Sequence, residues 1–168
     1  VLINNVGFGT NGQIDRFDLA EFQKMLDLNV KSQVSFFCQV RRSFRDQNRM
    51  MKVINISSTF SRVALPTLAP YAATKNAALE LTYRLAQEYT NLGISFASLC
   101  PGYFEHAKHQ KYFTSKWGSR FFASRVPMAR PGKPDEELAP AVALLCSREL
   151  RNVPYIEMFI DGGLSENH

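Results

Sequence analysis

The sequence is poor in the features that mark membrane and secreted proteins. Its 168 residues contain no apolar run near the roughly 20 residues that a membrane-spanning helix needs, and no signal-peptide pattern opens the chain. The three cysteines, Cys38, Cys100 and Cys146, lie far apart in apolar stretches. We interpret them as small buried residues in a reducing compartment, not as a disulfide framework or a metal site. These absences favour a cytoplasmic protein with no membrane partner.

A strong charge of one sign is also missing, since the formal net charge is +5. The densest basic cluster stands at the end of a predicted helix, where cations complement the helix dipole, and comprises Arg41, Arg42, Arg45, Arg49 and Lys52. Neither interleaved aromatic residues nor a nucleic-acid-binding motif accompanies this cluster. We therefore expect no nucleic-acid partner.

The chain lacks an initiator methionine and begins with Val1-Leu2-Ile3, a short apolar run typical of a buried strand. Natural domains seldom begin in the middle of a strand, so we expect a fragment whose N-terminal part is missing. The length suits one domain, here the whole of residues 1–168, and the sequence contains neither an internal repeat nor a low-complexity segment.

Short apolar runs alternate with segments of helical period. The runs at 1–3, 53–57, 94–100 and 155–160 predict buried parallel strands. Helices are predicted from a capping box at Asp18 and Glu21, over 70–92 with Gly93 as the stop, and from near Pro134, with Pro140 shifting or kinking the last one. This alternation predicts an α/β fold with right-handed crossovers.

The segment 103–130 shows no strong period but is rich in aromatic residues. A long segment of this kind is typical of a lid or substrate-binding loop. The alternative is a pair of short surface helices that cover the core.

Tyr71 and Lys75 are four residues apart in a predicted helix, so their side chains share one face. A free tyrosine has a pKa of about 10, and an ammonium group within ~4–6 Å lowers it. A tyrosine adjusted in this way can donate a proton to a carbonyl oxygen or accept one from an alcohol. Taken alone, the pair also fits a chance surface pair on an amphipathic helix.

Other short segments supply the context for this pair. In chain order they are Asn4-Asn5-Val6-Gly7, Leu28-Asn29-Val30, Ser58 thirteen positions before Tyr71, the Tyr71/Lys75 pair, Pro101-Gly102 and Asp161-Gly162-Gly163. In this order and spacing they resemble the short-chain dehydrogenase/reductase family, nicotinamide-dependent oxidoreductases built on a Rossmann-type, doubly wound parallel sheet. The segment 130–134, Arg-Pro-Gly-Lys-Pro, resembles the 3-oxoacyl-carrier-protein reductase-like branch, and polyol or sugar dehydrogenases share it.

The resemblance implies a catalytic role for Asn29, Ser58, Tyr71 and Lys75. Tyr71 would be the acid or base on the substrate oxygen, which Ser58 would hold by a hydrogen bond. Lys75 would lower the pKa of Tyr71 and bind the nicotinamide ribose. The backbone carbonyl of Asn29 would hold a water molecule that links Lys75 to solvent; a satisfied buried amide is its structural alternative. For the serine, Ser57 is a competitor.

The resemblance also implies NAD or NADP as the cofactor, without deciding between them. The implied cofactor-binding residues are Asn5, Val6, Gly7, Tyr71, Lys75, Pro101 and Gly102. The family often has a threonine where this sequence has His106, so the local grip on the cofactor differs here. His106 and His109 have no carboxylate or cysteine at ligand spacing, and we expect no metal site.

The family's glycine-rich phosphate turn, which opens the first helix after the first strand, has no counterpart in these residues. In the family's strand order 3-2-1-4-5-6-7, the chain would supply strands 4 to 7 only. Residues 1–3 would then be an uncovered apolar edge, which invites pairing or aggregation. We expect the 168-residue chain alone to be poorly soluble, to bind dinucleotides weakly and to be inactive.

Two functions follow as hypotheses. The first is an NAD(P)-dependent oxidoreductase that interconverts an alcohol and a carbonyl, with an apolar small-molecule substrate suggested by the aromatic segment. The second is a truncated, non-catalytic relative that acts through helix-mediated assembly, because the helices around Asn29 and Tyr71 resemble those of the family's four-helix dimer interface. A homodimer or homotetramer is expected.

Overall fold

The computed structural model describes residues 1–44, 50–107 and 110–166, which contain one parallel sheet. Its strands lie in the order β1 (Leu2–Asn4), β2 (Met51–Ile56), β3 (Ile94–Pro101) and β4 (Tyr155–Ile160). Each strand pairs in parallel with the next, for example Ile54 with Ala97 and Ala97 with Ile156. The predicted α/β fold and parallel sheet are confirmed.

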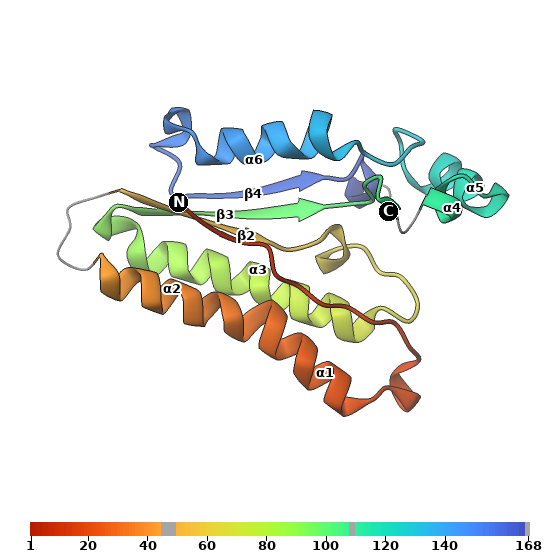
Figure 1. The fold of residues 1–168 in the computed structure, drawn as a ribbon, viewed down its shortest axis with the longest axis horizontal. Helices are drawn as coiled ribbons and strands as arrows, with labels where there is room; N and C mark the ends of the chain where they lie inside the picture. Colours follow the sequence, from red (N-terminus) through yellow and green to blue (C-terminus); the bar gives the residue numbers. More distant parts are fainter. Residues whose placement is uncertain (45–49, 108–109, 167–168) are drawn as a thin grey trace.

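Helices cover both faces of the sheet (Figure 1). They are α1 (Leu19–Leu26), α2 (Ser32–Ser43) and α3 (Ala69–Tyr89) on one face, α6 (Ala139–Cys146) on the other, and α4 (Gln110–Phe113) and α5 (Lys116–Arg125) beyond the carboxyl ends of β3 and β4. The described residues also include the π-helical turns η2 (Asp27–Lys31) and η6 (Pro134–Leu138). Short 3-10 turns are η1 (Ile14–Arg16), η3 (Thr59–Ser61), η4 (Thr90–Leu92), η7 (Arg148–Leu150) and η8 (Leu164–Glu166).

The core has one layer on each side of the sheet. On one side, Val53 and Phe96 pack with Phe37 of α2 and Ala86 of α3. On the other side, the next residues along the same strands, including Ile54, pack against α6. Successive strand residues point to opposite faces, and here both faces are buried. This explains why the strands read as continuous apolar runs and not as alternating ones.

The helix signals in the sequence act largely as expected. Asp18 caps α1 by accepting a hydrogen bond from the backbone N–H of Ala20 at 2.8 Å, whereas Glu21 accepts the hydroxyl of Thr10 at 2.9 Å. Gly93 follows η4 with φ at +75°, a conformation that favours glycine. The last helix is divided, since η6 precedes an α6 that carries Pro140 in its first turn. The predicted shift at this proline is confirmed.

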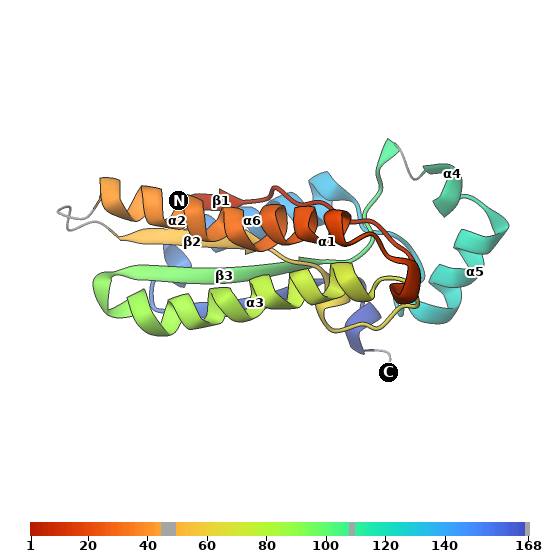
Figure 2. The same ribbon diagram turned by 90° about the horizontal axis from the view of Figure 1, so that it is seen from below.

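The aromatic segment contains the two short helices α4 and α5 (Figure 2). The ring of Tyr103 makes edge contacts with Phe60, Phe113, Phe121 and Phe122, with centroids 5.3 to 6.3 Å apart. Trp117 stacks on Phe121 at 5.4 Å and is 58% exposed. The segment thus has the form of paired surface helices around their own aromatic cluster.

The basic cluster is only partly described, because Arg45 and Arg49 lie outside the described residues. Lys52 hydrogen-bonds the carbonyls of Leu145 and Ser147 at the C-terminal end of α6, where a cation is favourable. None of the helices within the described ranges is long and apolar enough to cross a membrane.

Candidate active site

A cavity of about 510 Å³ opens where the carboxyl ends of β2 and β3 meet the first turns of α3. Ligands of open parallel α/β sheets bind at this edge of the sheet. The cavity is lined by Asn5, Gly7, Phe8, Gly9, Thr10, Asn11, Ile56, Ser57, Ser58, Phe60, Leu68, Tyr71, Lys75, Pro101 and Gly102. Three of the four residues expected to be catalytic and most of the expected cofactor residues therefore meet in one place.

Tyr71 and Ser58 both line this cavity. Ser58 caps η3 and accepts the backbone N–H of Phe60 at 3.2 Å. Burial raises the pKa of Tyr71, and a hydrogen bond with Ser58 opposes that rise. The net direction is upward because loss of hydration outweighs the hydrogen bond, so the lowering of this pKa by Lys75 stays a prediction.

Lys75 is 4% exposed, and its Nζ lies 5.9 Å from the centroid of the Tyr71 ring. The Nζ donates a hydrogen bond to the carbonyl of Ile56 at 3.0 Å. Burial lowers the pKa of Lys75 to about 8, against an opposing effect of Cys100. The predicted shared face of Tyr71 and Lys75 is confirmed, since both line the cavity.

Asn29 lies outside the cavity lining, but it supports the loop that walls the cavity. Its side chain is fully buried in η2. The Oδ1 accepts the backbone N–H of Phe8 at 2.8 Å, and Nδ2 donates to the Phe8 carbonyl and to Thr74 Oγ1, each at 2.8 Å. The amide thus joins the loop after β1 to α3. The satisfied buried amide given as the structural alternative is observed and is compatible with the relay role, which stays a prediction. π turns such as η2 are frequent at functional sites.

The two competing serines have different partners. Ser57 Oγ donates to the carbonyl of Lys75 at 2.8 Å, so this hydroxyl supports the backbone of α3. Ser58 is the serine that interacts with the Tyr71 hydroxyl. The geometry therefore favours Ser58 as the group that meets a substrate oxygen.

The expected cofactor residues differ in position. Asn5, Gly7, Pro101 and Gly102 line the cavity, whereas Val6 is 57% exposed and does not. A methyl group added at Gly7 would lie 3.1 Å from Lys75 Nζ, and one added at Gly102 would lie 2.5 Å from Asp161 Cβ. Glycine is needed at position 102 for this close approach, whereas at position 7 the Lys75 side chain would have to give by a few tenths of an ångström.

His106 is exposed, and His109 lies outside the described residues. Within the described part of the chain, no group of three or more His, Cys, Asp or Glu side chains could hold a metal ion.

Sequence reasoning missed several lining residues, namely Phe8, Gly9, Thr10, Asn11, Phe60 and Leu68. The glycine-rich stretch after the first strand carried a signal for them, since such loops often approach ligands closely. Phe60 and Leu68 had no local signal, because they enter the cavity only through the path of the loop between β2 and α3.

Comparisons with known proteins agree with this geometry. The fold and site define a parallel α/β protein with a Tyr–Lys–Ser centre at the carboxyl edge of its sheet. A family model described as enoyl-(acyl carrier protein) reductase matches residues 1–165. The chain belongs to the short-chain dehydrogenase/reductase family.

Individual relatives are dehydrogenases. Gluconate 5-dehydrogenase of Gluconobacter oxydans is 30% identical over 98% of this chain and 64% of its own length. 3beta-hydroxysteroid dehydrogenase 1 of Eggerthella lenta is 30% identical over 98% of this chain and 63% of its own. A crystal structure of a gluconate 5-dehydrogenase from Burkholderia cenocepacia J2315, in complex with NADP and tartrate, superposes with a TM-score of 0.89 at 32% identity. The superposition covers 98% of this chain and 64% of the chain of that crystal structure. The chain thus spans less than two thirds of these relatives.

Proposed function

We propose that this chain carries the acid–base centre of an NAD(P)-dependent oxidoreductase that interconverts an alcohol and a carbonyl. The observation that carries the proposal is the common cavity of Ser58, Tyr71 and Lys75 with Pro101 and Gly102. The names of the relatives support the same reaction class, and solved relatives bind NADP or NADH.

The proposed roles follow from the contacts. Tyr71 exchanges a proton with the substrate oxygen, and Ser58 donates a hydrogen bond to that oxygen. Because Ser58 Oγ already accepts the N–H of Phe60, its own proton is free to point at Tyr71 or at the substrate. Lys75 places an ammonium group beside the tyrosine, so that protons can pass along this chain of groups.

The residues present fit the nicotinamide half of a dinucleotide. Asn5, Gly7, Pro101 and Gly102 would hold it, and Lys75 has further N–H donors for ribose hydroxyls besides its bond to Ile56. When bound, the nicotinamide supplies or accepts the hydride. The chain's own residues orient it and hold the proton at Tyr71. Their geometry favours neither NAD nor NADP.

We also propose that the four strands β1, β2, β3 and β4 correspond to strands 4, 5, 6 and 7 of the complete family fold. It is supported by the 64% coverage of the relatives and by the lack of a glycine-rich phosphate turn in the 168 residues. The phosphate-binding contacts of the dinucleotide would then come from a segment outside these residues.

We further propose an apolar substrate, because Phe8, Phe60 and Leu68 line the cavity beside Tyr71. The segment 103–130 would act as the substrate lid. Its cluster reaches the cavity through the contact of Tyr103 with Phe60, whose centroids are 5.6 Å apart.

A second candidate function is assembly without catalysis. It is favoured by the exposed apolar side chains of α2, since Phe36 is 47% and Val34 38% exposed. A homodimer or homotetramer through α2 and α3 is compatible with both candidates, so oligomerisation alone does not separate them.

The separating experiment is a turnover assay of the protein expressed from its complete reading frame. Secondary alcohols and ketones with cyclic apolar groups are tested against sugar acids, each with NAD(H) and NADP(H), and nicotinamide absorbance is followed. Turnover of apolar substrates supports the enzyme. A folded oligomer that neither binds a dinucleotide nor turns over any of these substrates supports assembly.

A further inference from the structure

The loop after β1 lies along the catalytic face of α3. Glycines stand at two alternate positions of this loop, Gly7 and Gly9, and both approach α3. Gly7 faces Lys75, and Gly9 faces Tyr71. Residues two apart in an extended chain are about 6.6 Å apart, and residues four apart in a helix rise by about 6 Å. The spacing of the two glycines therefore matches the spacing of Tyr71 and Lys75 along the helix, so that one glycine lies against each of these side chains.

The approach is closest at Gly9. A methyl group added there would lie 2.6 Å from Cδ2, 2.8 Å from Cε2 and 3.2 Å from Cγ of Tyr71. Carbon atoms pack at about 3.5–4.0 Å, so any side chain at position 9 must move either the ring or the loop. The contact lies against the ring of the residue proposed to exchange the proton.

The loop is fixed on both sides of this contact. Asn29 holds both backbone groups of Phe8, as described above. Beyond Gly9, the Thr10 hydroxyl bonds Glu21, and the N–H of Gly12 donates to the carbonyl of Thr67 at 3.0 Å. Thr67 has φ at +71°, which is rare for a β-branched residue and indicates that this link is held under strain. The ring is therefore easier to displace than the loop.

We propose that Gly9 is a positioning residue, whose bare backbone sets the place of the Tyr71 ring relative to Ser58 and Lys75. The proposal rests on the proposed function for its effect on turnover, but the contact itself can be tested without it. Displacing a reacting group by about 1 Å costs on the order of 10²-fold in rate. Gly9→Ala should therefore lower kcat by about 10- to 100-fold.

The matched control is Gly12→Ala in the same loop. A methyl group there would lie 3.1 Å from a ring atom of Phe17, and Gly12 does not line the cavity. Its kcat should stay within about threefold of wild type, because the reacting groups keep their positions.

The pH–rate profile adds a second readout. Since burial raises the pKa of Tyr71, a displaced and better hydrated ring should give a lower apparent pKa in Gly9→Ala but not in Gly12→Ala.

A stability cycle separates this proposal from the proposed function. Urea unfolding is measured for wild type, Gly9→Ala, Tyr71→Ala and the double variant, all from the complete reading frame. If the methyl group meets the Tyr71 ring, Gly9→Ala lowers the urea midpoint when Tyr71 is present and not when residue 71 is alanine. If Gly9→Ala fails to fold, folding of the double variant gives the same support.

The deciding result depends on whether the wild type turns over. In an active protein, a kcat of Gly9→Ala within threefold of wild type, or an equal loss in Gly12→Ala, overturns the proposal. If the wild type shows no turnover, the proposed function fails, but the urea-unfolding cycle still tests the contact of Gly9. The contact with Tyr71 is overturned if Gly9→Ala changes the urea midpoint equally with tyrosine and with alanine at position 71.

Discussion

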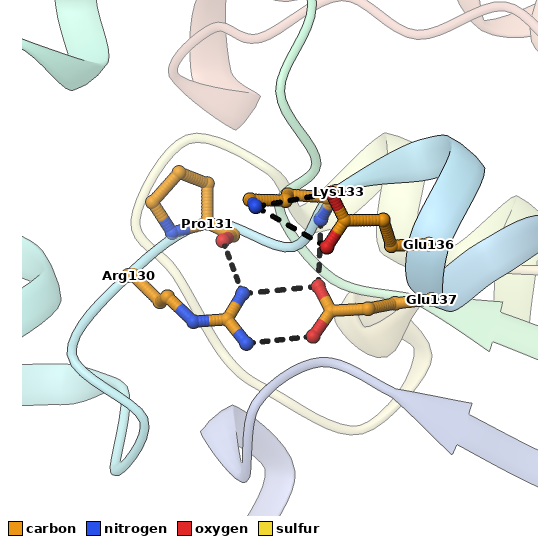
Figure 3. Close-up of polar contacts among 5 residues, drawn as sticks. All are labelled: Arg130, Pro131, Lys133, Glu136 and Glu137. Carbon is orange, nitrogen blue, oxygen red and sulfur yellow. Dashed lines mark hydrogen bonds and ion pairs between the residues drawn. The ribbon is translucent and has the colours of Figure 1, made fainter.

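Two clusters of charged and polar side chains occupy opposite kinds of environment in this molecule. One surrounds Lys75 and Asn29, which are 4% and 0% exposed. The other joins Arg130 to Glu137 ahead of α6, where the two side chains are 42% and 29% exposed (Figure 3). The exposed cluster has the better ion-pair geometry. The buried cluster contains the groups proposed to transfer protons.

The exposed cluster shows what good geometry does in contact with water. Arg130 binds both carboxylate oxygens of Glu137, at 3.0 and 2.6 Å, and Glu137 also accepts the backbone N–H of Lys133 at 2.7 Å (Figure 3). Lys133 in turn bonds Glu136 at 3.1 Å. The bond with Arg130 lowers the pKa of Glu137 to about 2. Because Arg130 and Glu137 also bond the backbone of Pro131 and Lys133, the cluster fixes a turn of the backbone.

In the buried cluster an ammonium group and an amide are held out of water. Burial lowers the pKa of Lys75 to about 8 and raises that of Tyr71. The shift of Lys75 brings its ammonium group closer to neutrality, which is useful for proton transfer, whereas the rise at Tyr71 keeps its phenol protonated at neutral pH. Burial, more than pairing, thus separates the candidate active site from the exposed Arg130–Glu137 cluster.

The largest effect should come from Lys75→Met. Turnover is expected to fall by at least about 10²-fold, because the proton path loses its ammonium group.

The variant also tests the burial of Lys75 through the stability of the protein. Folding lowers the pKa of Lys75 from 10.5 to about 8, so the folded state releases its proton first as the pH rises. The free energy of unfolding contributed by this group should therefore increase from pH 8 to 10.5, by about 3 kcal/mol in total.

The measurement for Lys75 is urea unfolding of wild type and Lys75→Met at pH 7, 8 and 9 without cofactor. Burial raises the pKa of Cys100 to about 12, which has the opposite effect on stability, and the difference between the two proteins is expected to remove it. The free energy of unfolding of the wild type should increase relative to that of Lys75→Met as the pH rises. A pH-independent difference would show that Lys75 is as hydrated as the exposed lysines.

Asn29→Ala should have the next largest effect. It leaves both backbone groups of Phe8 without their buried partner, at a cost of about 1–3 kcal/mol. The control is Asn76→Ala, which removes an exposed amide that donates to the Ser61 carbonyl and should cost well under 1 kcal/mol. Equal losses in chemical denaturation would contradict the tie between the loop and α3.

Arg130→Gln should have the smallest effect, in spite of its two short bonds. Water replaces the lost partner of Glu137, so Tm should fall by no more than about 3 °C and turnover should be unchanged. The contribution of Glu137 should be present above pH 4.5 and disappear toward pH 2, since its pKa is lowered on folding. Thermal melts at low and high salt check this; a large loss of turnover would remove the contrast between the two clusters.

The fold was predictable because the central strands β2 and β3 are largely buried on both faces and some helices carry local start and stop signals, such as Asp18 and Gly93. The site was predictable where its members have fixed spacing, as Tyr71 and Lys75 do on one helix. The spacing could not show that burial would dominate the pKa of Tyr71, because that burial depends on a loop far away in sequence. Asn29 was expected as a buried amide, but its π turn and its hold on Phe8 arise only from tertiary packing.

The central claim is that Tyr71 is the proton donor and acceptor of an alcohol–carbonyl oxidoreductase. It is tested most directly by Tyr71→Phe in the protein from its complete reading frame, with dinucleotide affinity and turnover measured side by side. The account predicts a loss of turnover of at least about 10²-fold with dinucleotide affinity nearly unchanged, because only the hydroxyl is removed. Turnover within about threefold of wild type would contradict it.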